Sequence, residues 1–489
     1  MRQLSIQDKL TPSKTAVAQF GGGVFLRGFA DHMIDIANEQ GIFDGGVAII
    51  KPTPSGSLEA FEQQDCAYTV IQRGLIDGEK MEAHRVISAI TQVINPFSAY
   101  DKFLDLAKSE DLRFVISNTT EAGIAFDETD QFDRKPANSF PGKLTQFLYA
   151  RYTHFSGAME RGLIMIPTEL IEDNGAKLHD CVNKLIALWN LPAQFAAWVE
   201  EACIFCNTLV DRIVSGYPAD EAEALEQNLL GYRDDLMVVS EPFGLWVIES
   251  PRIEKVQRAF PLDRAGMPVV FTDNLRPYRE QKVRILNGAH TSTVLAAYQV
   301  GLDIVSEAMA DQTIRAFLEQ VVYREIVPTV PLPADQVRGF ADSVMERFEN
   351  PFLRHLLLNI ALNSVSKWKT RILPSLKDSF AATGTLPPCL TFSLAALAGF
   401  YRSTEQGDGC LMGRRGGEAY AIRDDAQVLD FFAAHAPKPT AEFVQALLGN
   451  TAFWGEDLNN LGNMTTLVTN YCQNIEEFGM RRALEAVIA

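Results

Sequence analysis

Three polar residues interrupt an apolar stretch of the chain, "KVRILNGAHTS", which begins at Lys282. Asn287 follows five residues later and His290 three residues after that, with Ile285 and Leu286 among the apolar residues between. A lysine in apolar surroundings has a lowered pKa and can exchange a proton near neutral pH. An amide and an imidazole can hold a hydroxyl or carbonyl oxygen and stabilise the negative charge that develops on it. These residue types therefore predict acid–base chemistry on an alcohol or a ketone.

A regular α-helix does not by itself bring these three side chains together. At ~3.6 residues per turn, Lys282 and His290 are separated by roughly 80° around the axis, and Asn287 lies further round. A change of backbone conformation near Gly288, or a strand-to-helix change before Lys282, would have to help. The alternative is that the histidine belongs to the core and that the lysine extends its ammonium group along apolar surface into solvent.

A second candidate site lies near the N-terminus, where the sequence predicts a strand over 16–20, a turn over 21–23, one helix over 25–38 and a second strand over 47–50. This is a βαβ unit of the length found in dinucleotide folds. Glycines in such a turn let backbone N–H groups approach a pyrophosphate. Leu26 stands where the third glycine of GxGxxG is expected, and Arg27 offers positive charge instead. The candidate cofactor-binding residues are Gly21, Gly22, Gly23, Val24, Phe25, Arg27, Asn118, Thr119 and Thr120.

The end of the second strand carries Lys51, where NAD-binding chains usually have an acidic residue that accepts from the ribose hydroxyls. The lysine either meets a 2′-phosphate of NADP or is a solvated residue that leaves the ribose to other groups. The loop "SNTTEAG" at 117–123 follows a strand over 114–116, on the sheet edge where ligands of parallel sheets bind. An ordinary polar loop is the alternative there.

The order of predicted elements favours an α/β fold with a parallel-dominated, doubly wound sheet, followed by a mainly α-helical domain. Further strands are predicted within 163–166, 245–250 and 268–274, with helices between them, and only helices are predicted after about residue 280. We expect an N-terminal domain over 1–277 and a C-terminal domain over 278–489. Residues 401–417, which are rich in glycine, are predicted to form an exposed loop.

The charge of the chain limits its partners. With 44 basic and 62 acidic residues, the formal net charge is −18. Such a surface repels nucleic acid and anionic membranes, so an anionic small molecule needs a locally basic pocket. Seven scattered cysteines and an N-terminus without an apolar signal segment favour the cytoplasm. We expect no metal site, because the histidines form no HExxH pattern and Cys203-x-x-Cys206 has no second pair.

The motif Lys282-x4-Asn287-x2-His290 resembles the lysine–asparagine–histidine signature of the long-chain mannitol dehydrogenase family. Further similar segments occur in the family's order along nearly the whole chain: "QFGGGVFLRGF", "SNTTEAGI", "TLVDRI", "GLDIVSEAMAD", "RFENP" and "SKWKTRILP". The resemblance implies a Rossmann-type N-domain, a helical C-domain and zinc-independent, NAD-dependent oxidation of a polyol or a sugar acid.

The resemblance also implies roles for particular residues. Lys282 would be the general acid/base, Asn287 and His290 would position the reacting oxygen, and Lys367 and Asp211 would contact the substrate. Two departures argue against mannitol as the substrate. "TEL" at 168–170 replaces the family's "CDN", and an arginine that contacts polyols aligns near Asn359. If the substrate is a sugar acid, its carboxylate needs a cation, for which Lys367, Lys369 and Arg371 are candidates. The alternatives are another substrate of the same family, which is fructuronate or a neutral polyol, and a non-catalytic nucleotide-binding protein.

Overall fold

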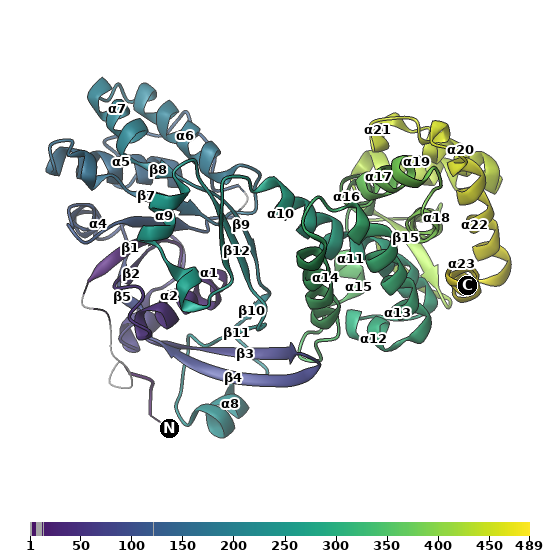
Figure 1. Ribbon diagram of the computed structural model, residues 1–489, viewed down its shortest axis with the longest axis horizontal. Coiled ribbons are helices and arrows are strands. Elements are labelled where there is room, and N and C mark those ends of the chain that lie inside the picture. The colour runs from purple at the N-terminus through teal and green to yellow at the C-terminus, as the bar shows by residue number, and fades with distance from the viewer. Residues whose placement is uncertain (1, 6–11, 13, 121) are drawn as a thin grey trace. The chain divides into compact units, whose positions relative to one another are not determined.

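The chain folds into two compact units, which are described separately. The computed structural model describes residues 2–5, 12, 14–120 and 122–489 (Figure 1). The first unit comprises Met1–Gly74 and Lys80–Leu275, and the second comprises Leu75–Glu79 and Arg276–Ala489. The segment Leu75–Glu79 therefore belongs to the second unit although its neighbours in sequence belong to the first.

A six-stranded sheet in which every pairing is parallel organises the first unit. Its strands, in spatial order, are β5 (Ile90–Ile94), β2 (Gly46–Ile50), β1 (Thr15–Phe20), β6 (Phe114–Ser117), β7 (Ile164–Pro167) and β8 (Ile204–Phe205). Counted within this sheet alone, the order is 3-2-1-4-5-6, which is that of dinucleotide-binding folds. The predicted parallel sheet is confirmed.

Alternate residues of each strand supply the two cores that cover this sheet. Val17 packs into one apolar cluster with residues of α1 and α2, whereas Ala18 and Phe20 pack into another with residues of α4 to α7. Helices thus cover both faces of the sheet (Figure 1). The helices of this unit are α1 (Val24–Gly28), α2 (Ala30–Glu39), α3 (Glu59–Gln63), α4 (Tyr100–Ala107), α5 (Phe140–His154), α6 (Asn174–Leu188), α7 (Ala193–Ala202), α8 (Ala222–Leu225) and α9 (Ile253–Ala259).

Two smaller sheets lie mainly in the first unit, apart from a hairpin tip at Leu75–Glu79. One contains β10 (Val214–Gly216), β11 (Val238–Ser240), β3 (Tyr68–Ile76) and β4 (Glu79–Ile87), and the other contains β13 (Val269–Thr272), β12 (Leu245–Glu249) and β9 (Asn207–Asp211). The strands predicted near 245 and 268 therefore exist but form a sheet of their own. The predicted helix over 25–38 is wrong as one helix, because Phe29, with φ −123° and ψ −83°, separates α1 from α2.

The second unit is mainly helical, as predicted. Its helices are α10 (Arg276–Gln281), α11 (Gly288–Val300), α12 (Val305–Ala310), α13 (Gln312–Glu319), α14 (Ala334–Phe348), α15 (Leu357–Ile360), α16 (Ser364–Arg371), α17 (Leu373–Thr383), α18 (Pro388–Tyr401), α19 (Ala426–His435), α20 (Thr440–Leu448), α21 (Thr451–Trp454), α22 (Met464–Phe478) and α23 (Met480–Ile488). Within the described ranges, no helix combines the length and apolar character that crossing a bilayer requires.

One prediction for this unit is wrong. Residues 401–417 do not form an exposed loop, because β14 (Gln406–Gly407) and β15 (Cys410–Arg415) lie within them. β15 pairs antiparallel with β14 and with β16 (Glu418–Ile422). Leu411, Tyr420 and Ile422 of this small sheet are buried against the helical core, which explains why so polar a segment is ordered.

Candidate active site

The glycine turn joins β1 to α1, and its three glycines have different environments. Gly21 has φ +121°, a conformation that side chains rarely adopt, and a Cβ there would lie 3.0 Å from the carbonyl oxygen of Asn118. A Cβ on Gly22 would lie 3.1 Å from Ile49. A Cβ on Gly23 would have no protein atom within 4 Å. The turn is thus closed on the protein side and open at Gly23, as a cradle for a ligand requires.

This turn lies at the point where the strand order of the sheet reverses. β1 pairs with both β2 and β6, and the loop after β6 approaches Gly21 through Asn118. The side-chain amide of Asn118 donates to the carbonyl oxygen of Thr168, at 3.2 Å, and the backbone and hydroxyl of Thr119 both donate to Glu169, at 2.9 Å. Burial raises the pKa of Glu169, whereas hydrogen bonds from Thr119 and Ser117 lower it. The segment "TEL" therefore fixes the loop after β6. Glu121 of "SNTTEAG" lies outside the described residues.

Val24, directly after the turn, is exposed and Phe25 is half-buried, whereas Arg27 is buried. Arg27 donates to the carbonyl oxygen of Leu236, and its guanidinium lies over the rings of Phe61 and Tyr68. Burial lowers its pKa, with Tyr68 and Asp31 opposing the shift. In the dinucleotide-binding fingerprint, the third glycine allows a helix to pack closely against a strand. Gly28 has this role here, because a Cβ at its position would lie 2.9 Å from Val214.

Lys51, at the end of β2, has its ammonium group engaged by main-chain oxygens. It donates to the carbonyl of Pro54, at 3.1 Å, and to that of Gly56. The side chain is buried, with 9% relative exposure. The charge of Lys51 therefore stabilises the loop after β2. This role differs from both predicted ones, which were binding a 2′-phosphate and remaining solvated.

The stretch that carries Lys282, Asn287 and His290 is helical throughout, but residues Lys282–Asn287 form a π-helical segment between α10 and α11. The i to i+5 pattern of a π-helix places Lys282 next to Asn287 along the axis. The α-helical pattern of α11 then places Asn287 next to His290, because residues three apart are neighbours on an α-helix. The π-helical turn therefore places Lys282, Asn287 and His290 on one face of the helix. A strand-to-helix change before Lys282 is not required to bring them together.

His290 occupies an aromatic and cationic environment. Its ring stacks on Phe348, with centroids 4.2 Å apart, and lies edge to face with His355 at 5.3 Å. Burial, followed by the charges of His355, Arg347, Arg371 and Lys367, lowers its pKa well below the usual value. The imidazole is therefore neutral near pH 7. Its Nε2 atom is buried without a hydrogen-bond partner among the described residues, as expected for a group that meets a ligand.

His355 was not selected from the sequence, and nothing in its local pattern marks it as a site residue. Its pKa is lowered by burial. Lys367 and Arg371 both lie on α16, and Lys367 donates to the carbonyl oxygen of Ile360 at 2.9 Å. Arg371 donates to the hydroxyl of Thr291, the residue after His290, at 3.4 Å. The second unit thus holds five of the predicted residues: Lys367 and Arg371 act electrostatically on His290, and Lys282 and Asn287 lie on the same helical face as His290.

The remaining candidates lie in the first unit. Asp211 is buried at the end of β9, and the adjacent Arg212 donates to main-chain oxygens, including that of Gly28 at 2.9 Å. Cys203 and Cys206 are both buried, and burial raises the pKa of each thiol to about 12. In the part of the chain that the structure describes, no three or more His, Cys, Asp or Glu side chains are placed to hold a metal ion.

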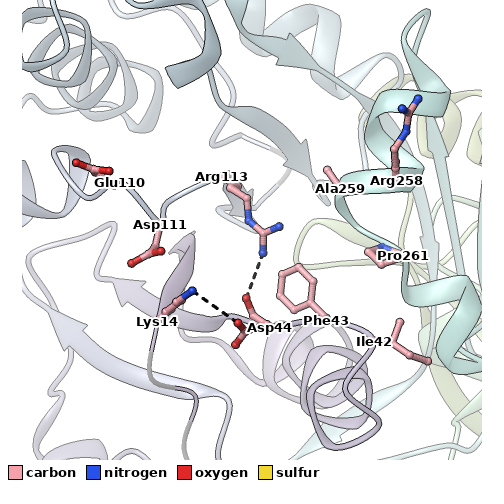
Figure 2. Close-up of a pocket in the computed structure, with 10 residues that line it drawn as sticks. All are labelled: Lys14, Ile42, Phe43, Asp44, Glu110, Asp111, Arg113, Arg258, Ala259 and Pro261. Atoms are coloured by element: carbon pink, nitrogen blue, oxygen red, sulfur yellow. Dashed lines mark hydrogen bonds and ion pairs between the residues drawn. The ribbon is translucent and has the colours of Figure 1, made fainter.

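A pocket of about 380 Å³ on the first unit lies at the other edge of the parallel sheet (Figure 2). Among its lining residues, Lys14 and Asp44 precede β1 and β2, and Arg113 precedes β6. Asp44 pairs with Lys14 at 3.9 Å and accepts from Arg113 through its carbonyl at 3.2 Å. Ligands of such sheets bind at the carboxyl ends of the strands, so we do not assign the active site to this pocket.

Comparison with known proteins assigns both units. The model described as "Mannitol dehydrogenase Rossmann domain" matches residues 15–260, and that described as "Mannitol dehydrogenase C-terminal domain" matches residues 274–476. The altronate oxidoreductase of Enterobacter sp. (strain 638) is 44% identical over 476 residues, and that of Escherichia coli (strain K12) is 43% identical over 475. Each alignment covers 96% of both chains.

Solved structures show the same fold at lower identity. The Pseudomonas fluorescens mannitol 2-dehydrogenase complex with NAD and D-mannitol is 20% identical, with a TM-score of 0.65, over 97% of this chain and 94% of that one. A substrate-free D-sorbitol dehydrogenase is 20% identical, with a TM-score of 0.77, over 99% and 100%. The resemblance predicted from the lysine–asparagine–histidine motif is confirmed, and the chain belongs to the mannitol dehydrogenase family.

Proposed function

We propose that this chain is an NAD-dependent oxidoreductase that interconverts D-altronate and D-tagaturonate. The observation that carries this proposal is the 42–44% identity to altronate oxidoreductases over 96% of the chain. The cationic surroundings of His290 support an acidic rather than a neutral substrate, because the rest of the chain is strongly acidic. Fructuronate and neutral polyols remain the alternative substrates.

We propose the glycine turn as the cofactor site and the His290 region as the substrate site, with residues 1–277 and 278–489 as the corresponding domains. The open space beside Gly23 fits a pyrophosphate that approaches the backbone. The engagement of Lys51 by two carbonyl groups supports NAD over NADP, because an ammonium group held in this way is a poor partner for a 2′-phosphate. The candidates Val24, Phe25, Asn118, Thr119 and Thr120 flank the same turn.

The proposed chemistry divides two tasks between two basic side chains. When bound beside the glycine turn, NAD would supply the hydride acceptor for oxidation of the alcohol, and NADH the hydride donor for reduction of the ketone. Lys282 takes the hydroxyl proton during oxidation and returns it during reduction. His290 is unsuited to that task because its lowered pKa makes it a weak base, but a neutral imidazole can hold the reacting oxygen by a hydrogen bond. Asn287, its neighbour on the face created by the π-turn, holds the same oxygen.

The proposal is tested by assaying Lys282→Ala and the wild type with altronate and NAD across pH. Loss of the acid/base group is expected to reduce kcat on the order of 10²-fold or more and to remove its ionisation from the pH profile. Titration with NADH by nicotinamide fluorescence should give an unchanged Kd. Near-normal kcat with an unchanged profile in the variant would assign the proton transfer to another group. NADH binding without turnover of any sugar acid or polyol would favour a non-catalytic nucleotide-binding protein.

We further propose that the enzyme acts in the cytoplasm as a small-molecule enzyme, without nucleic acid or membrane partners. All seven cysteines are free, which suits a reducing compartment.

A further inference from the structure

The basic residues of α16 lie on two faces of the helix. Lys367 and Arg371 are four residues apart and therefore share a face, whereas Lys369, two residues from each, does not. Both residues of the first face act electrostatically on His290. Lys369 lies elsewhere, with its Nζ 3.5 Å from the position that a Cβ on Gly455 would occupy. The three cations that the sequence offered as equal candidates are therefore separated by the helix.

Arg371 has fewer acceptors than two other shielded arginines of the chain, Arg151 and Arg415. Arg151 gives four hydrogen bonds to main-chain carbonyls, and Arg415 pairs with Asp303 at 2.7 Å. Arg371 gives one long hydrogen bond, 3.4 Å, to the hydroxyl of Thr291. Among the described residues, no carboxylate lies within ion-pair distance of it. Burial alone lowers its pKa, with no acidic neighbour opposing the shift.

A partly buried guanidinium without an anion is costly for the folded protein unless a ligand supplies the missing partner. This absence is informative in a chain with 62 acidic residues, because acidic side chains are plentiful elsewhere. Lys367 is a weaker candidate, since its ammonium already donates to Ile360 and the carboxylate of Asp424 acts on it. A planar guanidinium can also bind both oxygens of a carboxylate, which an ammonium group cannot match.

We propose that Arg371 binds the carboxylate of the sugar acid and so makes this site select acids over the corresponding neutral polyols. The proposal rests on the proposed function, which places the reacting oxygen at His290. Thr291 links the two groups, because it follows His290 in α11 and accepts from Arg371. In a six-carbon sugar acid the carboxylate and a carbonyl carbon within the chain are separated by several bonds. The cation that binds the carboxylate must therefore lie next to the group formed by Asn287 and His290, at a distance from the reacting oxygen that they hold.

The test compares matched ligands on matched variants by calorimetry, with NADH present so that the acid cannot be oxidised. The ligands are altronate and altritol, which has a hydroxymethyl group in place of the carboxylate, and a second pair, mannonate and mannitol. We expect Arg371→Met to weaken binding of the preferred acid on the order of 10²-fold or more. Its effect on the matching polyol should stay within about threefold. Arg371→Lys should lie between, because it keeps the charge and loses the planar fork.

Lys369→Met is the matched control, since it removes a charge from the other face of the same helix and should leave both affinities unchanged. Equal losses for acid and polyol in Arg371→Met would show a structural role and overturn the proposal. So would a wild type that binds neither acid better than its polyol. Turnover of altronate by the wild type with NAD is measured separately. A wild type that oxidises mannonate but not altronate, with the acid-specific loss intact in Arg371→Met, would refute the proposed substrate and leave the carboxylate subsite standing.

Discussion

Asp31 supports a prediction of how stability changes with pH. The residue lies in α2 with its side chain fully shielded from solvent. One carboxylate oxygen accepts from the amide of Gln19 at 3.3 Å and lies 3.2 Å from the hydroxyl of Tyr68, whereas the other has no partner among the described residues. Burial raises the pKa of Asp31 from 3.8 to about 7, against the lowering effects of Gln19, Tyr68 and Arg27. Gln19 also donates to the carbonyl of Gly21, so the carboxyl lies behind the proposed cofactor turn.

The sign of the effect follows from proton uptake. Between pH about 4 and about 7 the folded chain retains a proton on Asp31 that the unfolded chain has lost, so stability falls as pH rises through this range. The shift of roughly three pKa units corresponds to ~4 kcal/mol in total, at about 1.4 kcal/mol per unit. Most of this, on the order of 2–3 kcal/mol, is lost between pH 5 and pH 8. Asn at this position keeps the shape and carries no titrating group.

The assay is the melting temperature of the wild type and of Asp31→Asn, each from pH 5 to pH 8. We expect the difference between them to move in favour of the variant by several degrees as pH rises, since ~1 kcal/mol is worth ~2–4 °C in larger domains. Asp105→Asn is the control, because it removes an exposed aspartate that pairs with Lys108 at 2.8 Å. If the difference in melting temperature is constant with pH, or moves in favour of the wild type as pH rises, then Asp31 does not retain its proton in the folded protein.

Three further predictions concern the cofactor and metals. Gly23→Val should raise the Kd for NADH at least tenfold without changing the melting temperature, because its side chain meets no protein atom within 4 Å; Gly21→Ala should instead lower the melting temperature, because φ there is +121°. Lys51→Met should leave the preference for NAD over NADP within about threefold of wild type, measured as a ratio of kcat/KM, because its ammonium serves main-chain carbonyls. Activity should survive prolonged dialysis against EDTA, and loss of activity with recovery on adding zinc would contradict a lysine acid/base.

The sequence predicted the first βαβ unit well because its signals agree with one another. The strands around 16–20 and 47–50 are buried on both faces and mostly apolar, as expected of parallel strands, and three glycines separate the first from its helix. The break at Phe29 was missed because the apolar periodicity continues from α1 into α2. Only the approach of Gly28 to Val214, a contact distant in sequence, shows why the backbone changes course there.

The sequence analysis did not predict β3, β4, β15 or β16. The local sequence of these strands resembles a helix or a loop, and their strand conformation depends on contacts with other segments. β3 and β4 flank Asp77-Gly78, both with positive φ, which is the turn chemistry typical of a hairpin, so this signal was present in the sequence. β4 is largely exposed and polar, which hid its strand character. β15 and β16 pair around Gly416 and Gly417, and their order comes from burial of Leu411 and Ile422 against distant helices.

The candidate site shows the same division between residue type and geometry. Residue types and the family resemblance made Lys282, Asn287 and His290 candidates, but an α-helical spacing separated them, and the π-turn that gives them one face has no sequence signature. A π-turn is rare within an α-helix, and it persists because the surrounding packing maintains it. Ile285 and Leu286, both buried within that turn, supply the packing. The apolar residues that made the stretch resemble an ordinary core helix are therefore those that hold its irregular part in place. This irregular turn places Lys282, Asn287 and His290 on a common face, which a regular α-helix would not do.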